Sequence, residues 1–65
     1  MEKPEYKIGD IVIYIGFLGY IKQGVIRSAI YFTEEDVFFG KGWRYYVSSR
    51  ANSWIVEQKK IISKA

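Results

Sequence analysis

The chain has 65 residues and a formal net charge of +3, which suits one small domain near the lower size limit for independent folding. Because it contains no cysteine and no histidine, disulfide bonds and ordinary zinc sites are excluded. Stability must come from apolar packing, since 49% of the residues are hydrophobic and 18% are aromatic. We expect a single domain over residues 1–65, with flexible tails at 1–6 and 63–65, that leaves some aromatic rings at its surface.

The positive charge is concentrated in the C-terminal part of the chain. Residues 41–65 carry six Lys and Arg against Glu57 alone, whereas acidic residues outnumber basic ones in residues 1–40. This distribution favours an anionic partner, although a lysine-rich surface can simply keep a protein in solution. The N-terminus lacks the apolar stretch of a signal peptide, and no run approaches about 20 apolar residues. We therefore expect a soluble, cytoplasmic protein without a membrane partner.

Short β-branched and aromatic runs separated by glycine predict strands in the first half of the chain. The first is Ile11–Ile15, which follows a turn at Gly9-Asp10 and ends at the glycine-containing loop 16–19. It is apolar on both faces, which is typical of a strand that is central or covered by a partner. A longer strand runs from about Tyr20 to Phe32, and Gly24 within it predicts a bulge or a sharp bend.

The second half of the chain predicts three further short strands. Residues 43–47 form the first, and alternation divides its side chains between two faces: Trp43, Tyr45 and Val47 on one, Arg44 and Tyr46 on the other. A polar hairpin loop at 48–52 leads to a strand at 53–56. One tight helical turn near residues 57–60 precedes a last short strand at 61–62. The chain is thus predicted to be all-β, with about five antiparallel strands and one short 3-10 turn.

This order of elements resembles the small SH3-like barrels of Tudor and KOW domains and of many small bacterial and phage proteins. The resemblance covers roughly residues 6 to 62 and rests on these segments: Gly9–Val12, Gly24–Ile26, Tyr45–Val47, Trp54–Glu57 and the following Ile61. It implies a closed ring of strands that binds a partner and has no catalytic role. In such barrels the Asp after the first Gly supports the turn, so Asp10 is expected to be structural.

An enzymatic function is not expected. The type II plasmid dihydrofolate reductases share the opening Gly-Asp and the strand order, but they depend on a Val-Gln-Ile-Tyr stretch. The corresponding residues 53–56 read Ser-Trp-Ile-Val and lack both the Gln and the Tyr. The chain offers no His or Cys for catalysis, and the carboxylates at 34–36 form a local run that does not face a second carboxylate across a cleft. We therefore expect neither catalysis nor a cofactor.

Two binding functions remain open. Cationic side chains interleaved with rings are typical of surfaces that hold single-stranded nucleic acid, and the candidate residues are Lys41, Arg44, Tyr46, Arg50, Trp54 and Lys59. Exposed rings and arginine are equally typical of protein interfaces, which would make the chain an adaptor, an assembly subunit, a phage-type modulator of a host protein or a homo-oligomer.

The rings themselves leave a further choice between an aromatic cage and a core. A cage for a cation, as in Tudor-type readers, needs converging rings, and the candidates are Tyr14, Phe17, Tyr20, Trp43, Tyr46 and Trp54. Rings on strands are more often part of the core.

Overall fold

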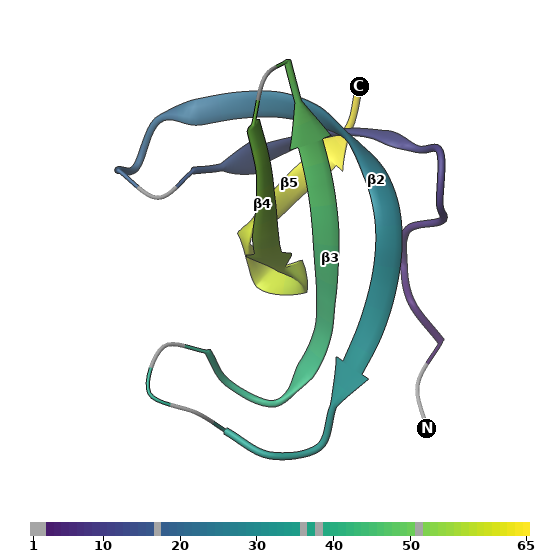
Figure 1. The fold of residues 1–65 in the computed structure, drawn as a ribbon, viewed down its shortest axis with the longest axis vertical. Coiled ribbons are helices and arrows are strands. Elements are labelled where there is room, and N and C mark those ends of the chain that lie inside the picture. Colours follow the sequence, from purple (N-terminus) through teal and green to yellow (C-terminus); the bar gives the residue numbers. More distant parts are fainter. Residues whose placement is uncertain (1–2, 17, 36, 38, 51) are drawn as a thin grey trace.

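The computed structural model describes residues 3–16, 18–35, 37, 39–50 and 52–65. It confirms an all-β fold of five antiparallel strands with one 3-10 turn (Figure 1). The elements are β1 (Ile11–Ile15), β2 (Ile21–Phe32), β3 (Gly42–Ser49), β4 (Asn52–Glu57), η1 (Gln58–Lys60) and β5 (Ile61–Lys64). No helix in the described part of the chain is long and apolar enough to cross a membrane.

The strands form one sheet in the order β4-β3-β2-β1-β5. The long strand β2 connects the two halves of the sheet. The first half of β2 pairs with β1, and the second half pairs with β3. The predicted irregularity in β2 exists but lies at a different place. Pairing with β3 shifts between Ile26 and Ser28, so the bulge falls at Arg27 and not at Gly24.

Gly24 allows β2 and β3 to approach each other closely. A Cβ atom at this position would lie 2.6 Å from Cγ1 of Val47 and 2.8 Å from the carbonyl oxygen of Ser48. Both distances are shorter than real Cβ contacts, so the glycine is required by packing. The predicted bulge at Gly24 is therefore wrong, and a glycine is needed at this position because β3 lies so close to it.

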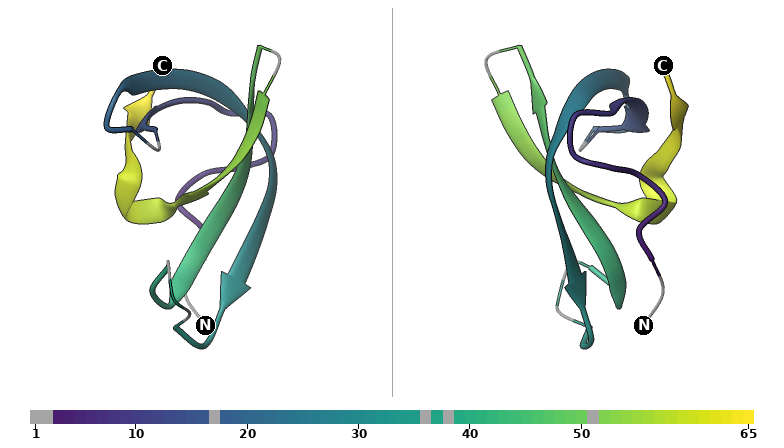
Figure 2. Two further views of the ribbon diagram at one scale, coloured as in Figure 1. Left: turned by 60° about the vertical axis from the view of Figure 1, so that its left-hand side comes forward. Right: turned by 90° about the vertical axis from the view of Figure 1, so that its right-hand side faces the viewer.

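The sheet is strongly curved but is not closed into the predicted ring. β4 and β5 lie at the two ends of the strand order, and they diverge from η1, which connects them (Figure 2). β5 has four residues, and its pairing with β1 is irregular between Ile13 and Tyr14. Such a short, interrupted strand provides little edge for β4 to pair with. β5 nevertheless runs to Lys64, past the point at which the sequence predicts a tail.

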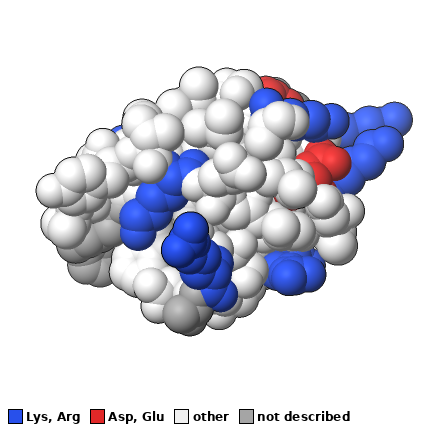
Figure 3. Space-filling view, turned by 90° about the horizontal axis from the view of Figure 1, so that it is seen from above, with Lys and Arg blue, Asp and Glu red and all other residues white. Residues whose placement is uncertain are grey.

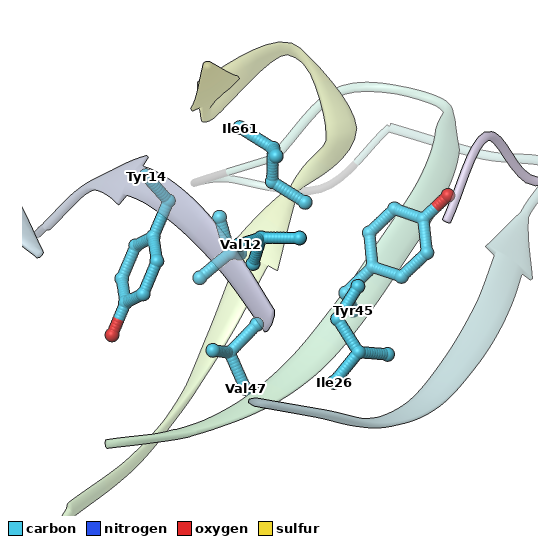
Figure 4. Packing of buried hydrophobic residues seen from close by; sticks show 7 residues of the cluster. Val12, Tyr14, Ile26, Tyr45, Val47 and Ile61 are labelled. Carbon is cyan, nitrogen blue, oxygen red and sulfur yellow. The ribbon is translucent and has the colours of Figure 1, made fainter. Parts of the chain in front are cut away.

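The core fills the concave side of the sheet (Figure 4). Its buried members come from all five strands and are Val12, Tyr14, Ile26, Tyr45, Val47, Val56 and Ile61. The predicted inner face of β3 is confirmed, because Tyr45 and Val47 are buried and Trp43 packs against the cluster. Each fully buried aliphatic side chain contributes about 1.5–3 kcal/mol, which is a large share of stability for a domain this small.

Asp10 supports the turn before β1, as the resemblance implies. Its Oδ2 accepts a hydrogen bond from the backbone N–H of Lys7 at 2.9 Å, and its own N–H donates to the Lys7 carbonyl oxygen at 3.0 Å. Gly9 has a φ of +97° within this turn, a conformation that glycine adopts without steric cost. The Lys64 ammonium lies 3.4 Å from the same Oδ2, so the turn also holds the end of β5.

Candidate functional site

Arg44 does lie on the outer face of β3, but its side chain is covered. Only 6% of the residue is exposed. The guanidinium carbon lies 3.7 Å from the centre of the Phe32 ring and 4.8 Å from that of Phe39, and Nη2 donates to the carbonyl oxygen of Gly40 at 3.3 Å. Stacked cation–π contacts of this kind stabilise a fold. Arg44 is therefore a structural residue and does not offer the outward cation that the sequence predicts.

Tyr46 and Trp54 are both exposed, but they face opposite sides of the sheet. Tyr46 pairs with Ile55, and Trp54 pairs with Val47, and directly opposite residues in an antiparallel sheet share a face. Trp54 therefore lies on the side of the buried Val47, and Tyr46 lies on the outer side. The two rings cannot contribute to one flat patch.

The three other predicted cations are exposed but widely spaced. Lys41 precedes β3, and Arg50 follows it at the tip of the β3–β4 hairpin, so the length of a strand separates them. Lys59 belongs to η1, and its Nζ lies 3.5 Å from Oε2 of Glu57. The structure thus divides the six predicted residues among several surfaces.

A pocket of about 340 Å³ lies between the β1–β2 loop and the β3–β4 hairpin. Its lining comes from both segments: Tyr14, Gly16, Leu18, Tyr20 and Lys22 from the first, and Ser49, Asn52, Ser53 and Trp54 from the second. Two aromatic side chains are well exposed there, Tyr20 by 67% and Trp54 by 49%. Ser49 connects the hairpin to β2 directly after Lys22, because its Oγ donates to the Gln23 carbonyl oxygen at 2.9 Å.

The charge around this pocket is positive. Lys22 lines it, Arg50 lies in the adjacent hairpin loop, and no carboxylate occurs among the described lining residues. Figure 3 shows the molecule from the end where the hairpin and the start of β2 lie, and Lys and Arg side chains stand over the middle of this face while carboxylates lie toward one side. Such a site favours an anionic ligand.

The same lining argues against a cage for a cation. Of the candidate cage rings, Tyr14 is buried and Trp43 packs against the core, so Tyr20 and Trp54 are the exposed pair that borders this pocket. Phe17, another candidate, lies outside the described residues. Rings attract a cation through their quadrupole, but the Lys22 ammonium in the same lining repels a second cation.

Sequence reasoning placed Arg50 and Trp54 among the nucleic-acid candidates and Tyr20 only among the possible cage rings, and it missed Lys22. Residues 20–22 become neighbours of residues 49–54 only when the sheet curves. The available signal was the glycine-bounded loop at 16–19 directly before Tyr20, because binding residues are disproportionately carried on or beside loops.

The acidic run at 34–36 is described only in part. Glu34 and Glu35 are exposed, and Asp36 lies outside the described residues. Among the residues that the structure describes, no group of three or more His, Cys, Asp and Glu side chains could hold a metal ion. No protein-family model matches the chain, and no curated protein or solved structure matches it.

Proposed function

We propose that this chain is a non-catalytic, cytoplasmic SH3-like module that binds single-stranded nucleic acid at the pocket between the β1–β2 loop and the β3–β4 hairpin. The observation that carries the proposal is the presence of two exposed rings, Tyr20 and Trp54, beside Lys22 and Arg50. The SH3-like assignment is supported by the strand order β4-β3-β2-β1-β5 and by the 3-10 turn before the last strand.

Each component of the pocket has a distinct task in this function. Tyr20 and Trp54 offer ring faces on which bases stack, a contact of about 1–3 kcal/mol per base. Lys22 and Arg50 are placed to neutralise phosphates, and each such contact releases counterions and makes the affinity depend on salt. The exposed side chain of Asn52 adds hydrogen-bonding capacity at the rim.

A single strand fits this arrangement better than a duplex does. The rings stack on base faces, and these faces are accessible only where bases are unpaired and can be splayed out. In a duplex the same faces are covered by neighbouring base pairs. The module is therefore expected to prefer single strands of either DNA or RNA and to show little sequence preference.

The decisive experiment measures binding of fluorescently labelled single-stranded oligonucleotides, and of a duplex of equal length, by anisotropy at several salt concentrations. Tyr20→Ala should weaken single-strand binding by about 5- to 150-fold, the equivalent of one lost stacking contact. The double variant Lys22→Ala/Arg50→Ala should lower the slope of log affinity against log salt by about 1.4, because each phosphate contact on a single strand contributes about 0.7.

The matched control is Lys41→Ala/Lys59→Ala, which removes the same charge far from the pocket. It should leave the salt slope nearly unchanged. Absence of binding at low salt, or equal losses in the two double variants, would contradict the proposal. Circular dichroism of each variant checks that the fold is retained.

A further inference from the structure

The two edges of the sheet differ in how well they are protected. β5 is four residues long, is paired irregularly with β1 and ends at Lys64, and these are features that discourage edge-to-edge association. β4 pairs with β3 without interruption from Asn52 to Glu57. It contains no proline, and no Lys or Arg interrupts it. Of the two edges, only that of β4 is a regular, unprotected template.

The free edge of β4 lies along an apolar groove of about 600 Å³. Among the described residues, 53–57 of β4 line the groove together with Ile15, Gly16, Phe39, Tyr46 and the single cation Lys60. Figure 2 shows β4 diverging from β5, so this side of the strand is not covered by the rest of the sheet. Ile55 is 44% exposed and Tyr46 is 45% exposed.

We propose that β4 pairs antiparallel with β4 of a second copy of this chain, around a two-fold axis centred at Ile55. The two-residue hairpin loop makes Ser49 and Asn52 the closing pair, which is hydrogen-bonded in such hairpins, and backbone groups alternate in direction along the strand. The N–H and C=O groups of Ser53, Ile55 and Glu57 therefore point to the free edge. A two-fold axis at Ile55 pairs Ile55 with itself and Ser53 with Glu57 of the second copy.

The side chains support a second copy as the occupant. In this register the outer face carries a continuous apolar row, because Tyr46 pairs with Ile55 in each copy and the two Ile55 side chains meet at the axis. Glu57 lies opposite Ser53 of the second copy, so no charge faces a like charge. In the dimer both β4 edges are hydrogen-bonded to each other, and the two protected β5 edges form the outer ends of the combined sheet. The assembly therefore stops at two copies.

The exposed area sets the expected strength of the dimer. On the outer face Tyr46 and Ile55 are each a little under half exposed, and even a fully buried ring removes only about 150–250 Å² from water. A few such side chains and one strand edge fall short of the roughly 800 Å² per partner of a standard stable interface. The dimer is therefore expected to be reversible and to form as the protein concentration rises.

Sedimentation velocity across a concentration series tests this inference with two matched variants. Ile55→Lys puts a charge on the axis, and Ile30→Lys puts the same charge on the outer face of β2, where Ile30 is 54% exposed and pairs with Arg44 instead of an edge. We expect the wild type and Ile30→Lys to shift from 7.6 kDa toward twice that mass, and Ile55→Lys to stay monomeric. The inference would be overturned if the wild type stayed monomeric or formed assemblies larger than a dimer. It would also be overturned if Ile55→Lys dimerised as strongly as the wild type.

Amide hydrogen exchange of the wild type keeps the test decisive even if Ile55→Lys fails to fold. The amides of Ser53, Ile55 and Glu57 should exchange more slowly as concentration rises, whereas those of Trp54 and Val56 should not change. Equal behaviour of the two sets would overturn the proposed register. Oligonucleotide affinity of folded Ile55→Lys should equal that of the wild type, because Ile55 faces away from the pocket side of β4, so this inference and the proposed function can fail separately.

Discussion

The phenol of Tyr45, which reaches across the core from β3, donates a hydrogen bond to Oε1 of Gln58 in η1. The same phenol oxygen accepts a hydrogen bond from the backbone N–H of Tyr6 at 3.4 Å, and the two tyrosine rings meet edge to face with their centres 5.6 Å apart. Gln58 Oε1 also accepts from the N–H of Glu5 at 3.3 Å. One buried side chain therefore connects the N-terminal segment to the turn between β4 and β5.

Replacing this tyrosine separates the contribution of its ring from that of its hydroxyl. Tyr45→Phe should lower the free energy of unfolding by about 1 kcal/mol, the net value of a typical hydrogen bond. Tyr45→Ala should cost about 3–5 kcal/mol, because it leaves a cavity in the core. Urea denaturation measures both, with Tyr46→Phe as an exposed control expected to stay within about 0.5 kcal/mol of wild type. Equal costs for the Phe and Ala variants would show that the ring is not packed as described.

Alkaline pH should destabilise the fold through the same residue. Burial raises the pKa of the Tyr45 phenol, and the Tyr6 N–H opposes this only in part. Because the folded state holds the proton more tightly, the stabilisation is fully present below the unfolded pKa of about 10 and is lost as pH rises above it. The free energy of unfolding of Tyr45→Phe should fall less steeply in this range. Parallel pH profiles for the variant and the wild type would contradict the prediction.

Acid pH should act through Asp10. The hydrogen bond from the Lys7 N–H lowers the pKa of the Asp10 carboxyl; desolvation opposes this shift, and the Lys64 ammonium adds to the lowering. The stabilisation is present above the unfolded pKa of about 3.9 and is lost as pH falls through the lower folded value. Asp10→Asn should flatten the acid limb of stability against pH, and Lys64→Gln should flatten it less. An unchanged acid limb in Asp10→Asn would exclude this role.

Gly24→Ala tests the close approach of β2 and β3. The added methyl group would meet Val47 and the Ser48 backbone, and overpacking of this kind typically costs about 1–3 kcal/mol. Gly40→Ala is a matched control, because among the described residues the nearest atom to the added Cβ would be Oε2 of Glu57 at 3.9 Å, an ordinary contact. Thermal denaturation should show a clear loss for the first variant and a change within about 0.5 kcal/mol for the second. If Gly24→Ala left the thermal stability unchanged, β2 and β3 would be able to move apart without cost.

Arg44→Lys tests the structural role of the covered guanidinium. Lysine keeps the charge but cannot stack a planar group between Phe32 and Phe39, so a loss of about 1–2 kcal/mol is expected. Arg27→Lys, at an exposed position of β2, should be neutral. Oligonucleotide affinity of folded Arg44→Lys should remain that of the wild type, and a selective loss of binding without a loss of stability would return Arg44 to the candidate site.

The strands could be predicted from the sequence because the local pattern and the structure agree. Alternation placed Tyr45 and Val47 in the core, and glycines marked the ends of Ile11–Ile15. The candidate site could be predicted only in part. The face of Trp54 depends on the length of the hairpin loop, since a shift of one residue turns every side chain of a strand to the other face. Arg44 is covered by Phe32 and Phe39, and these two rings come close to its guanidinium only in the folded structure.

The connection through η1 has a mechanical consequence. β4 and β5 are not hydrogen-bonded to each other. The distance between these two edge strands therefore depends on the three residues of η1 and on the Tyr45 phenol, which hydrogen-bonds both to Gln58 and to the N-terminal segment. The gap between β4 and β5 is therefore only as rigid as the hydrogen bond between Tyr45 and Gln58. Loss of that bond would let the two edge strands move apart while the core stays packed.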